Sequence, residues 1–168
     1  VSDGTDFSSS AATYTITYAA VNDAPAFSAA TTAVDAAENQ QAVGTYTATD
    51  AESDTITYAK SGTDSDLFTL GSSNGVLTFS SAPNFEAPGC GANDDSNTCT
   101  VIITATATGG SDTNTITVTV TNVNDNSPTD MALSASSAAE NAAAGTDIGT
   151  LSTTDGDASG NSHVYTLV

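Results

Sequence analysis

A repeat of 102 residues is the feature that most restricts how this chain can fold. Asn22 in "VNDAP" is followed 102 positions later by Asn124 in "NVNDNSP", and Glu38 in "AENQQ" is followed at the same interval by Glu140 in "AENAA". Repetition of a block of this length indicates one structural module used more than once. In 168 residues we therefore expect the end of one module at 1–25, a complete module at 26–126 and the start of a third at 127–168.

Apolar residues alternate with threonine over long parts of the repeat. In "NTITVTVT", Ile116, Val118 and Val120 would point to one face of a strand and the threonines to the other. The stretch "TVIITATAT" shows the same alternation, with Val101 and Ile103 on the expected core face. A period of two residues is typical of a strand with one buried face.

Seven strands are expected in the complete module. They lie at 31–34, 42–48, 55–59, 67–70, 76–79, 100–106 and 114–123. "LFTLGSSNGVLTF" is expected to form a hairpin that turns at Asn74 and Gly75. Seven short strands in one module predict an antiparallel Greek-key β-sandwich. The expected fold class is all-β, a tandem of immunoglobulin-like sandwiches with one complete and two partial modules.

The charge of the chain narrows the classes of partner. One Lys+Arg stands against 20 Asp+Glu, which gives a formal net charge of −19. Nucleic acid is excluded as an expected partner, because neutralising phosphates requires clustered Lys and Arg. Cations are favoured instead. The sequence contains no apolar run long enough for a transmembrane helix.

Two cysteines, Cys90 and Cys99, lie close together in "GCGANDDSNTCT". Glycine and asparagine between them would allow a disulfide that closes a small loop, and a disulfide suits an oxidising, extracellular location. Two free thiols are the alternative. A zinc site is less favoured, because two cysteines alone are not a closed ligand set.

Acidic and amide side chains gather at the expected module ends. If the fold brings these segments together, their carboxylates repel one another, by about 4 kcal/mol for a pair about 4 Å apart at an effective dielectric near 20. Ca²⁺ reverses the sign of that repulsion and accepts carboxylate, amide and backbone oxygens in flexible geometry. The candidate ligands at the second junction are Glu38, Glu86, Asn122, Asn124, Asp125, Asn126, Asp155, Asp157 and Asn161.

The motifs "AEN", the "FE" of "PNFE", "NVNDNSP" and "DGDASGN", in that order, resemble cadherin repeats. The threonine-rich style resembles the cadherin-like modules of bacterial surface proteins. The resemblance implies calcium sites between modules that make a string of sandwiches rigid, with the residues above as ligands. Two positions depart from the family pattern, because Asn122 and Asn84 stand where the family has aspartates.

The first junction matches the resemblance less well. Its candidate ligands are Asn22, Asp23, Asp50 and Glu52. Ala20, Ala24 and Ala107 occupy positions where the family has oxygen ligands, so we expect this junction to hold fewer ions and to bend more easily. A solvated acidic loop is the alternative interpretation of Asp50, Glu52 and Asp54.

We expect no enzyme, because His163 has no nucleophile motif beside it and no glycine-rich phosphate loop is present. The favoured function is a calcium-rigidified segment of a secreted or cell-surface adhesin, stalk or fibre. The alternatives are a module that recognises glycan, protein or another copy of itself, and an accessory domain of a large secreted enzyme. A further hypothesis is that partial modules of different chains complete one another and form a filament.

Overall fold

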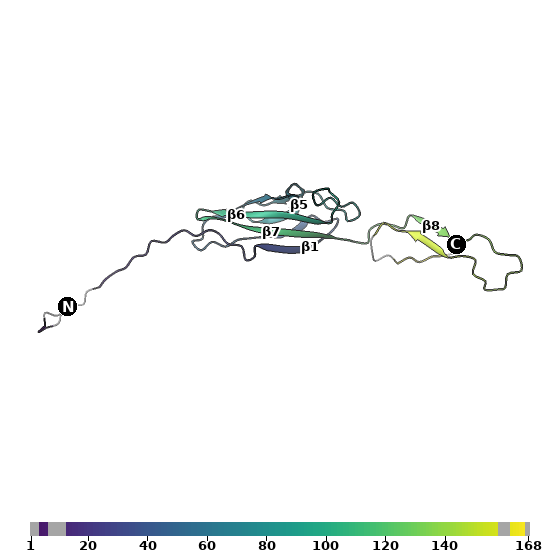
Figure 1. Ribbon diagram of the computed structural model, residues 1–168, viewed down its shortest axis with the longest axis horizontal. Coiled ribbons are helices and arrows are strands. Elements are labelled where there is room, and N and C mark those ends of the chain that lie inside the picture. Colours follow the sequence, from purple (N-terminus) through teal and green to yellow (C-terminus); the bar gives the residue numbers. More distant parts are fainter. Residues whose placement is uncertain (1–3, 7–12, 158–161, 167–168) are drawn as a thin grey trace.

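The computed structural model describes residues 4–6, 13–157 and 162–166. A β-sandwich lies in the middle of an elongated molecule, and a small hairpin follows it at the C-terminal end (Figure 1). Residues 13–21 run out as an extended segment on the opposite side. Among the described residues, no helix is long and apolar enough to span a membrane.

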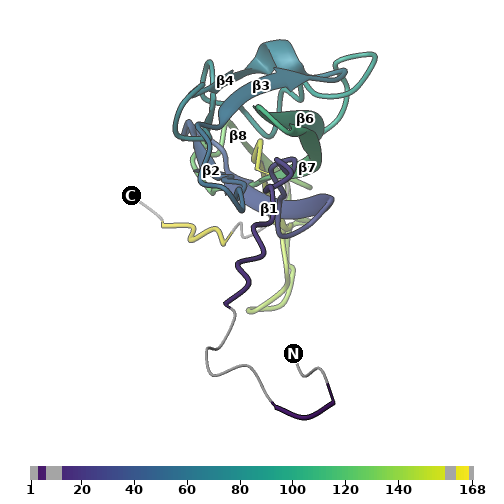
Figure 2. The same cartoon turned by 90° about the vertical axis from the view of Figure 1, so that its left-hand side faces the viewer.

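The sandwich has two sheets, which lie face to face in Figures 1 and 2. One sheet has the order β1-β7-β6-β3 and the other the order β2-β5-β4. β1 is parallel to β7, whereas the other neighbours are antiparallel. The bounds are β1 Thr31–Ala37, β2 Ala42–Thr45, β3 Thr57–Ser61, β4 Phe68–Leu70, β5 Val76–Phe79, β6 Thr98–Ala107 and β7 Gly110–Thr121. The predicted all-β sandwich is therefore confirmed, and all seven strands are present. The β5 bounds are as predicted and the other six strands differ at one or both ends, and the pairing of β1 with β7 is parallel rather than antiparallel.

The core lies between the two sheets and uses the predicted faces of the strands. Ile116, Val118 and Val120 of β7 are buried, while the threonines between them face outward. From the other sheet, Phe68 and Phe79 stack with their ring centroids 4.7 Å apart. Threonine and β-branched apolar residues suit this arrangement, because both fit a pleated surface that is buried on one side only.

The hairpin of β4 and β5 turns at the predicted glycine. Gly75 has a φ of 65°, and a Cβ at this position would lie 2.2 Å from the carbonyl oxygen of Tyr46. Both the left-handed backbone and the close approach of Tyr46 therefore require glycine. A 3₁₀ turn before this hairpin, η1 Ser65–Leu67, was not expected from the sequence.

The loop between β5 and β6 is held at two points. A disulfide joins Cys90 and Cys99, as expected, and both residues are buried. The buried carboxylate of Asp64 accepts the backbone N–H of Gly91 at 2.8 Å and that of Thr100 at 2.6 Å. The disulfide and Asp64 thus fix the middle of the loop, at Cys90 and Gly91, to the start of β6.

The C-terminal part contains one antiparallel pair, β8 Asp130–Leu133 and β9 Leu151–Thr154. Its backbone repeats a detail of the sandwich. Asn39 and Asn141 are 102 residues apart, and both have a φ of 61°. Left-handed backbone is rare outside glycine, so the shared conformation supports the structural equivalence of the two "AEN" motifs.

Candidate metal centre

Glu38 ties three segments together at the end of β1. Its side chain is 1% exposed. One carboxylate oxygen, Oε2, accepts the N–H of Phe85 at 2.8 Å, and Oε1 accepts the N–H of Val123 at 2.7 Å. The strand end, the turn at 84–86 and the linker after β7 therefore meet at one buried carboxylate.

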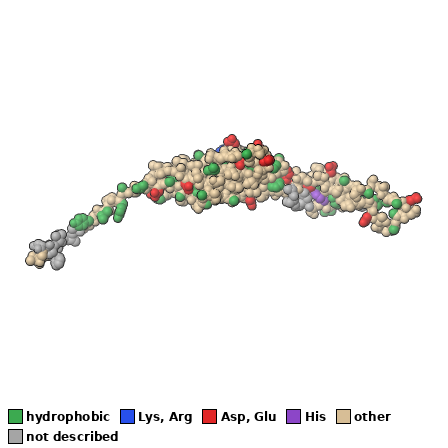
Figure 3. Space-filling model, viewed as in Figure 1, with side chains coloured by type: hydrophobic (Ala, Val, Ile, Leu, Met, Phe, Trp, Pro, Cys, Tyr) green, Lys and Arg blue, Asp and Glu red, His purple; other side chains and the backbone are tan. Residues whose placement is uncertain are grey.

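Three carboxylates converge at this point. Glu38, Glu86 and Asp125 each place one oxygen within 4.8 Å of the oxygens of the other two. Asn84 shapes the turn that presents Glu86, because its Oδ1 accepts the N–H groups of Glu86 and Ala87 at 2.8 and 3.1 Å. Asn39 steadies the third carboxylate by donating from Nδ2 to Oδ2 of Asp125. In Figure 3, several acidic side chains lie where the sandwich meets the C-terminal part.

Asp157 links the C-terminal part to the linker. Its buried carboxylate accepts the N–H of Asn126 at 3.1 Å and the side-chain amide of Asn126 at 3.0 Å. Asp155 turns the loop toward this site, because its Oδ1 accepts the N–H of Asp157 at 3.1 Å. The other oxygen of Asp155 lies 3.9 Å from Nδ1 of His163.

The pKa shifts of Glu86, in the complete module, and of Asp157, in the C-terminal part, have opposite directions. Loss of hydration raises the pKa of Glu86, a backbone hydrogen bond opposes this, and the charges of Glu38, Asp157 and Asp125 raise it further. Burial alone would also raise the pKa of Asp157, but the hydrogen bonds from Asn126 and from backbone N–H groups outweigh it and lower that pKa. Glu86 therefore carries the unfavourable charge of the cluster, and a cation beside it would relieve the repulsion.

The first junction is a second polar cluster, at the start of the sandwich. Asn22 donates from Nδ2 to Oδ2 of Asp54 at 2.7 Å, and the N–H of Asp23 donates to Glu52 at 3.1 Å. Asp50 accepts the N–H groups of Glu52 and Asp54 with Oδ1. Within the described residues, the buried atoms Oδ1 of Asn22 and Oδ2 of Asp50 have no hydrogen-bond donor. Buried acceptors without a donor are suited to a cation.

The structure places the predicted residues in two groups. Glu38, Glu86, Asp125, Asn126, Asp155 and Asp157 lie at the second junction, and Asn22, Asp23, Asp50 and Glu52 at the first. Asn122 is partly buried and Asn124 is exposed, and both lie on the linker between β7 and β8. Asn161 is outside the described residues. The sequence reasoning missed Asn39, although its repetition as Asn141 in the second "AEN" could have directed attention to it. For Asp54 the sequence indicates only a solvated acidic loop, whereas its carboxylate accepts the side-chain amide of Asn22.

The donor set fits calcium. The groups available for an ion are three carboxylates at the second junction and a carboxylate and an amide oxygen at the first, and Ca²⁺ takes about 6–8 oxygen ligands of these and similar kinds. At the second junction three carboxylate oxygens already lie within 4.8 Å of one another. Zn²⁺ would be expected to use Cys or His ligands, but the two cysteines are joined to each other, and among the described residues the residue of the site that His163 approaches is Asp155, with 3.9 Å between Nδ1 and the carboxylate oxygen.

Solved cadherin structures are similar to this chain. Human protocadherin-24 EC1-2 matches with a TM-score of 0.63 and 25% identity over 81% of this chain and 61% of that chain. The fold is cadherin-like. Drosophila N-cadherin EC1-4 matches with a TM-score of 0.60 and 25% identity over 81% of this chain and 34% of that one. The extracellular domain of protocadherin GammaB4 matches with a TM-score of 0.59 and 27% identity, covering 86% and 23% respectively.

The chain spans less than two thirds of each of these cadherin fragments. No protein-family model and no curated protein matches its sequence. The evidence for the cadherin-like fold is therefore the similarity in three dimensions, at sequence identities of 25% to 27%.

Proposed function

We propose that this protein is part of a tandem array of cadherin-like modules on an extracellular adhesin, stalk or fibre, and that Ca²⁺ bound between modules makes the array stiff. In this proposal residues 1–25 are the end of one module, residues 26–126 are a complete module and residues 127–168 are the start of a third. The observation that carries the proposal is the convergence of Glu38, Glu86 and Asp125 from three separate segments within 4.8 Å. Carboxylates this close repel one another, and a bound cation would offset the repulsion.

In the proposed mechanism, the metal cross-links three parts of the chain. Glu38 and Glu86 belong to the complete module, and Asp125 and Asn126 to the linker, with Asn122 and Asn124 beside them. Asp155 and Asp157 supply the module that follows, with Asn161 as a further candidate. A bound Ca²⁺ supplies positive charge, so that separating the modules would expose uncompensated carboxylates. Asn22, Asp23, Asp50 and Glu52 would act in the same way at the first junction.

The proposed location is outside the cell. A disulfide persists in an oxidising compartment, and cadherin extracellular domains share the fold. Calcium affinities of about 10⁻⁴–10⁻³ M are typical of extracellular modules and suffice where calcium is abundant. The threonine-rich, lysine-poor composition leads us to assign the array to a bacterial surface protein, in which its role is structural rather than catalytic.

Calorimetric titration of Ca²⁺ into chelator-treated protein tests the proposal. We expect Asp125→Ala to lose heat of binding and to lose part of the increase in melting temperature that calcium causes. Asp94→Ala is the matched control, since Asp94 is an exposed acid in the disulfide loop and the change in net charge is the same. Equal heats and equal melting shifts in the wild type and Asp125→Ala would remove Asp125 from the site.

A further inference from the structure

We propose that Asn97, in the loop closed by Cys90 and Cys99, is a positioning residue for the calcium site at the second junction. In this inference the disulfide loop, residues 90–99, holds the turn at 84–86 in place and thereby sets the position of Glu86. The inference rests on the calcium binding proposed above. It adds a role for the disulfide loop, to which that proposal gives none.

The peptide bond that leads into Glu86 is held at both of its polar groups. The carbonyl oxygen of Phe85 accepts Nδ2 of Asn97 at 2.9 Å. The N–H of Glu86, on the other side of the same peptide bond, donates to Oδ1 of Asn84 at 2.8 Å. The N–H of Phe85 donates to Oε2 of Glu38 at 2.8 Å. Asn97 therefore supplies the contact that ties this turn to the disulfide loop.

The turn is not held in place by close packing along its whole length. Phe85 is partly buried and packs against the core. Asn84 and Ala87, however, line a pocket of about 390 Å³ together with Asn97 and Cys90 of the disulfide loop. Open space beside a backbone segment gives it no van der Waals contacts on that side. The hydrogen bond from Asn97 crosses from the loop to the turn at this point.

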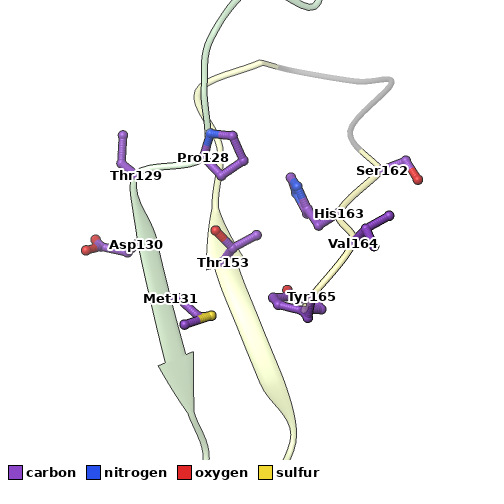
Figure 4. Close-up of a pocket in the computed structure, with 9 residues that line it drawn as sticks. All are labelled: Pro128, Thr129, Asp130, Met131, Thr153, Ser162, His163, Val164 and Tyr165. Atoms are coloured by element: carbon purple, nitrogen blue, oxygen red, sulfur yellow. The ribbon is translucent and has the colours of Figure 1, made fainter. Parts of the chain in front are cut away.

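This pocket belongs to the complete module. Its lining residues lie between Asp66 and Val120. The pocket beside the C-terminal hairpin, shown in Figure 4, is lined by residues between 128 and 165 and shares none of them. The support that Asn97 gives to the turn therefore does not require the module that follows.

The backbone of the disulfide loop fixes the position of Asn97. Its carbonyl oxygen accepts the N–H of Val120 in β7 at 2.7 Å. The preceding residue, Ser96, exchanges two backbone hydrogen bonds of 3.0 Å with Cys90. Two residues after Asn97, Cys99 is joined to Cys90 by the disulfide. Asn97 thus lies in a short, closed piece of chain that is anchored on the sandwich.

Glu86 needs this support because neighbouring charges repel it. The carboxylates of Glu38, Glu86 and Asp125 each place one oxygen within 4.8 Å of the oxygens of the other two. Without an ion, this repulsion favours movement of the exposed Glu86 away from the cluster. Asn97 is uncharged, so it opposes the movement without adding to the repulsion. A turn that is already in place loses less conformational freedom when an ion binds, which raises the affinity.

NMR titration of Ca²⁺ into chelator-treated Asn97→Ala tests the inference. The backbone amides of Phe85 and Val123 report on the second junction, because both donate to Glu38. We expect the Kd read from them to be weaker than in the wild type by about tenfold or more, the range found when a supporting contact behind metal ligands is removed. The amide of Asp23, at the first junction, should follow the wild-type curve.

Two control variants separate positioning from a general loss of stability. Asn93→Ala makes the same change at an exposed position of the disulfide loop. Ile103→Val removes one methylene group from a fully buried core position of β6 and destabilises the fold away from the turn. Both should keep the wild-type Kd at the second junction. An equal loss of affinity in Ile103→Val and Asn97→Ala would overturn the inference.

The role of the disulfide is tested with Cys90→Ala combined with Cys99→Ala. We expect this double variant to bind calcium more weakly at the second junction, in the same direction as Asn97→Ala. Asn97→Ala keeps the disulfide, so the test of the positioning contact does not depend on the folding of the double variant.

Hydrogen exchange in chelator gives a readout without metal. We expect the amides of Phe85 and Glu86 to exchange faster in Asn97→Ala than in the wild type and in Asn93→Ala. Unchanged exchange would overturn the inference, because the turn would then keep its place without Asn97.

The same titration distinguishes failure of this inference from failure of the proposed function. If the Phe85 and Val123 amides of the wild type do not respond to calcium, the proposed function is wrong and this inference falls with it. If they respond and Asn97→Ala gives the same Kd, only the positioning role of Asn97 is wrong.

Discussion

At the scale of single residues, Glu38 has a structural role that is independent of any metal. Its buried carboxylate accepts two backbone N–H groups, from Phe85 and Val123. Glutamine has one acceptor oxygen, and its amide would face the second N–H as another donor. We expect Glu38→Gln to lower the free energy of unfolding by about 1–3 kcal/mol even in chelator, measured by urea denaturation.

Glu86→Gln is the control for this prediction, because Glu86 belongs to the same carboxylate cluster but is exposed. In chelator, the free energy of unfolding of Glu86→Gln should be at least as large as that of the wild type, since one repelling charge has been removed. If Glu38→Gln unfolds at the same urea concentration as the wild type, the two backbone contacts contribute nothing to stability.

The opposite pKa shifts of Glu86 and Asp157 predict a dependence on pH. The raised pKa of Glu86 means that its ionised form destabilises the metal-free fold, and protonation relieves this as the pH falls through the folded pKa. The lowered pKa of Asp157 acts in the other direction, giving stability above its unfolded pKa that is lost as the pH falls through the folded one.

Carboxyl NMR titration in chelator should therefore give a midpoint above the ordinary value for Glu86 and below it for Asp157. Calcium should move the Glu86 midpoint downward, since the ion favours the charged form. A Glu86 midpoint that calcium leaves unchanged would place this residue away from the ion.

At the scale of elements, the turn between β6 and β7 packs against Asn22 and Asp23, in the linker before the sandwich. A Cβ on Gly109 would lie 1.9 Å from the carbonyl oxygen of Asp23. We expect Gly109→Ala to push the linker off the sandwich and break the bond from the Asp23 N–H to Glu52. Hydrogen exchange at the Asp23 amide should become faster.

Gly89→Ala is the matched control for the turn, because a Cβ there meets nothing within 4 Å. Its Asp23 amide should exchange at the wild-type rate. Similar exchange in both variants would mean that the linker does not depend on its contact with the turn.

At the scale of the whole molecule, calcium should straighten the second junction. In Figure 1 the sandwich and the C-terminal part lie nearly end to end. We expect small-angle X-ray scattering to give a larger radius of gyration in calcium than in chelator, because repelling carboxylates at a free junction let the two parts bend. Asp125→Ala should remove the response to calcium. A radius that is the same in both buffers would contradict the proposed stiffening.

The sequence alone determined the seven strands of the sandwich and the acidic residues at the ends of the repeat. Alternation with a period of two identified β6 and β7, because a strand's pattern depends only on residues next to one another along the chain. The repeat paired Glu38 with Glu140 and directed attention to the acids at module ends. The strand ends and η1 escaped prediction, because local turns there depend on contacts such as Asp64 with Gly91 and Thr100.

Only the tertiary structure decided which of these residues meet. Asn39 donates to Asp125 from 86 residues away, and the oxygen of Asn84 is used inside its own turn rather than toward the cluster. Glu38 proved to be buried and bound to backbone on both sides. Such convergence is set by the order of strands in the sheets, which joins segments far apart in the chain, and no local pattern of residues encodes the distances between them.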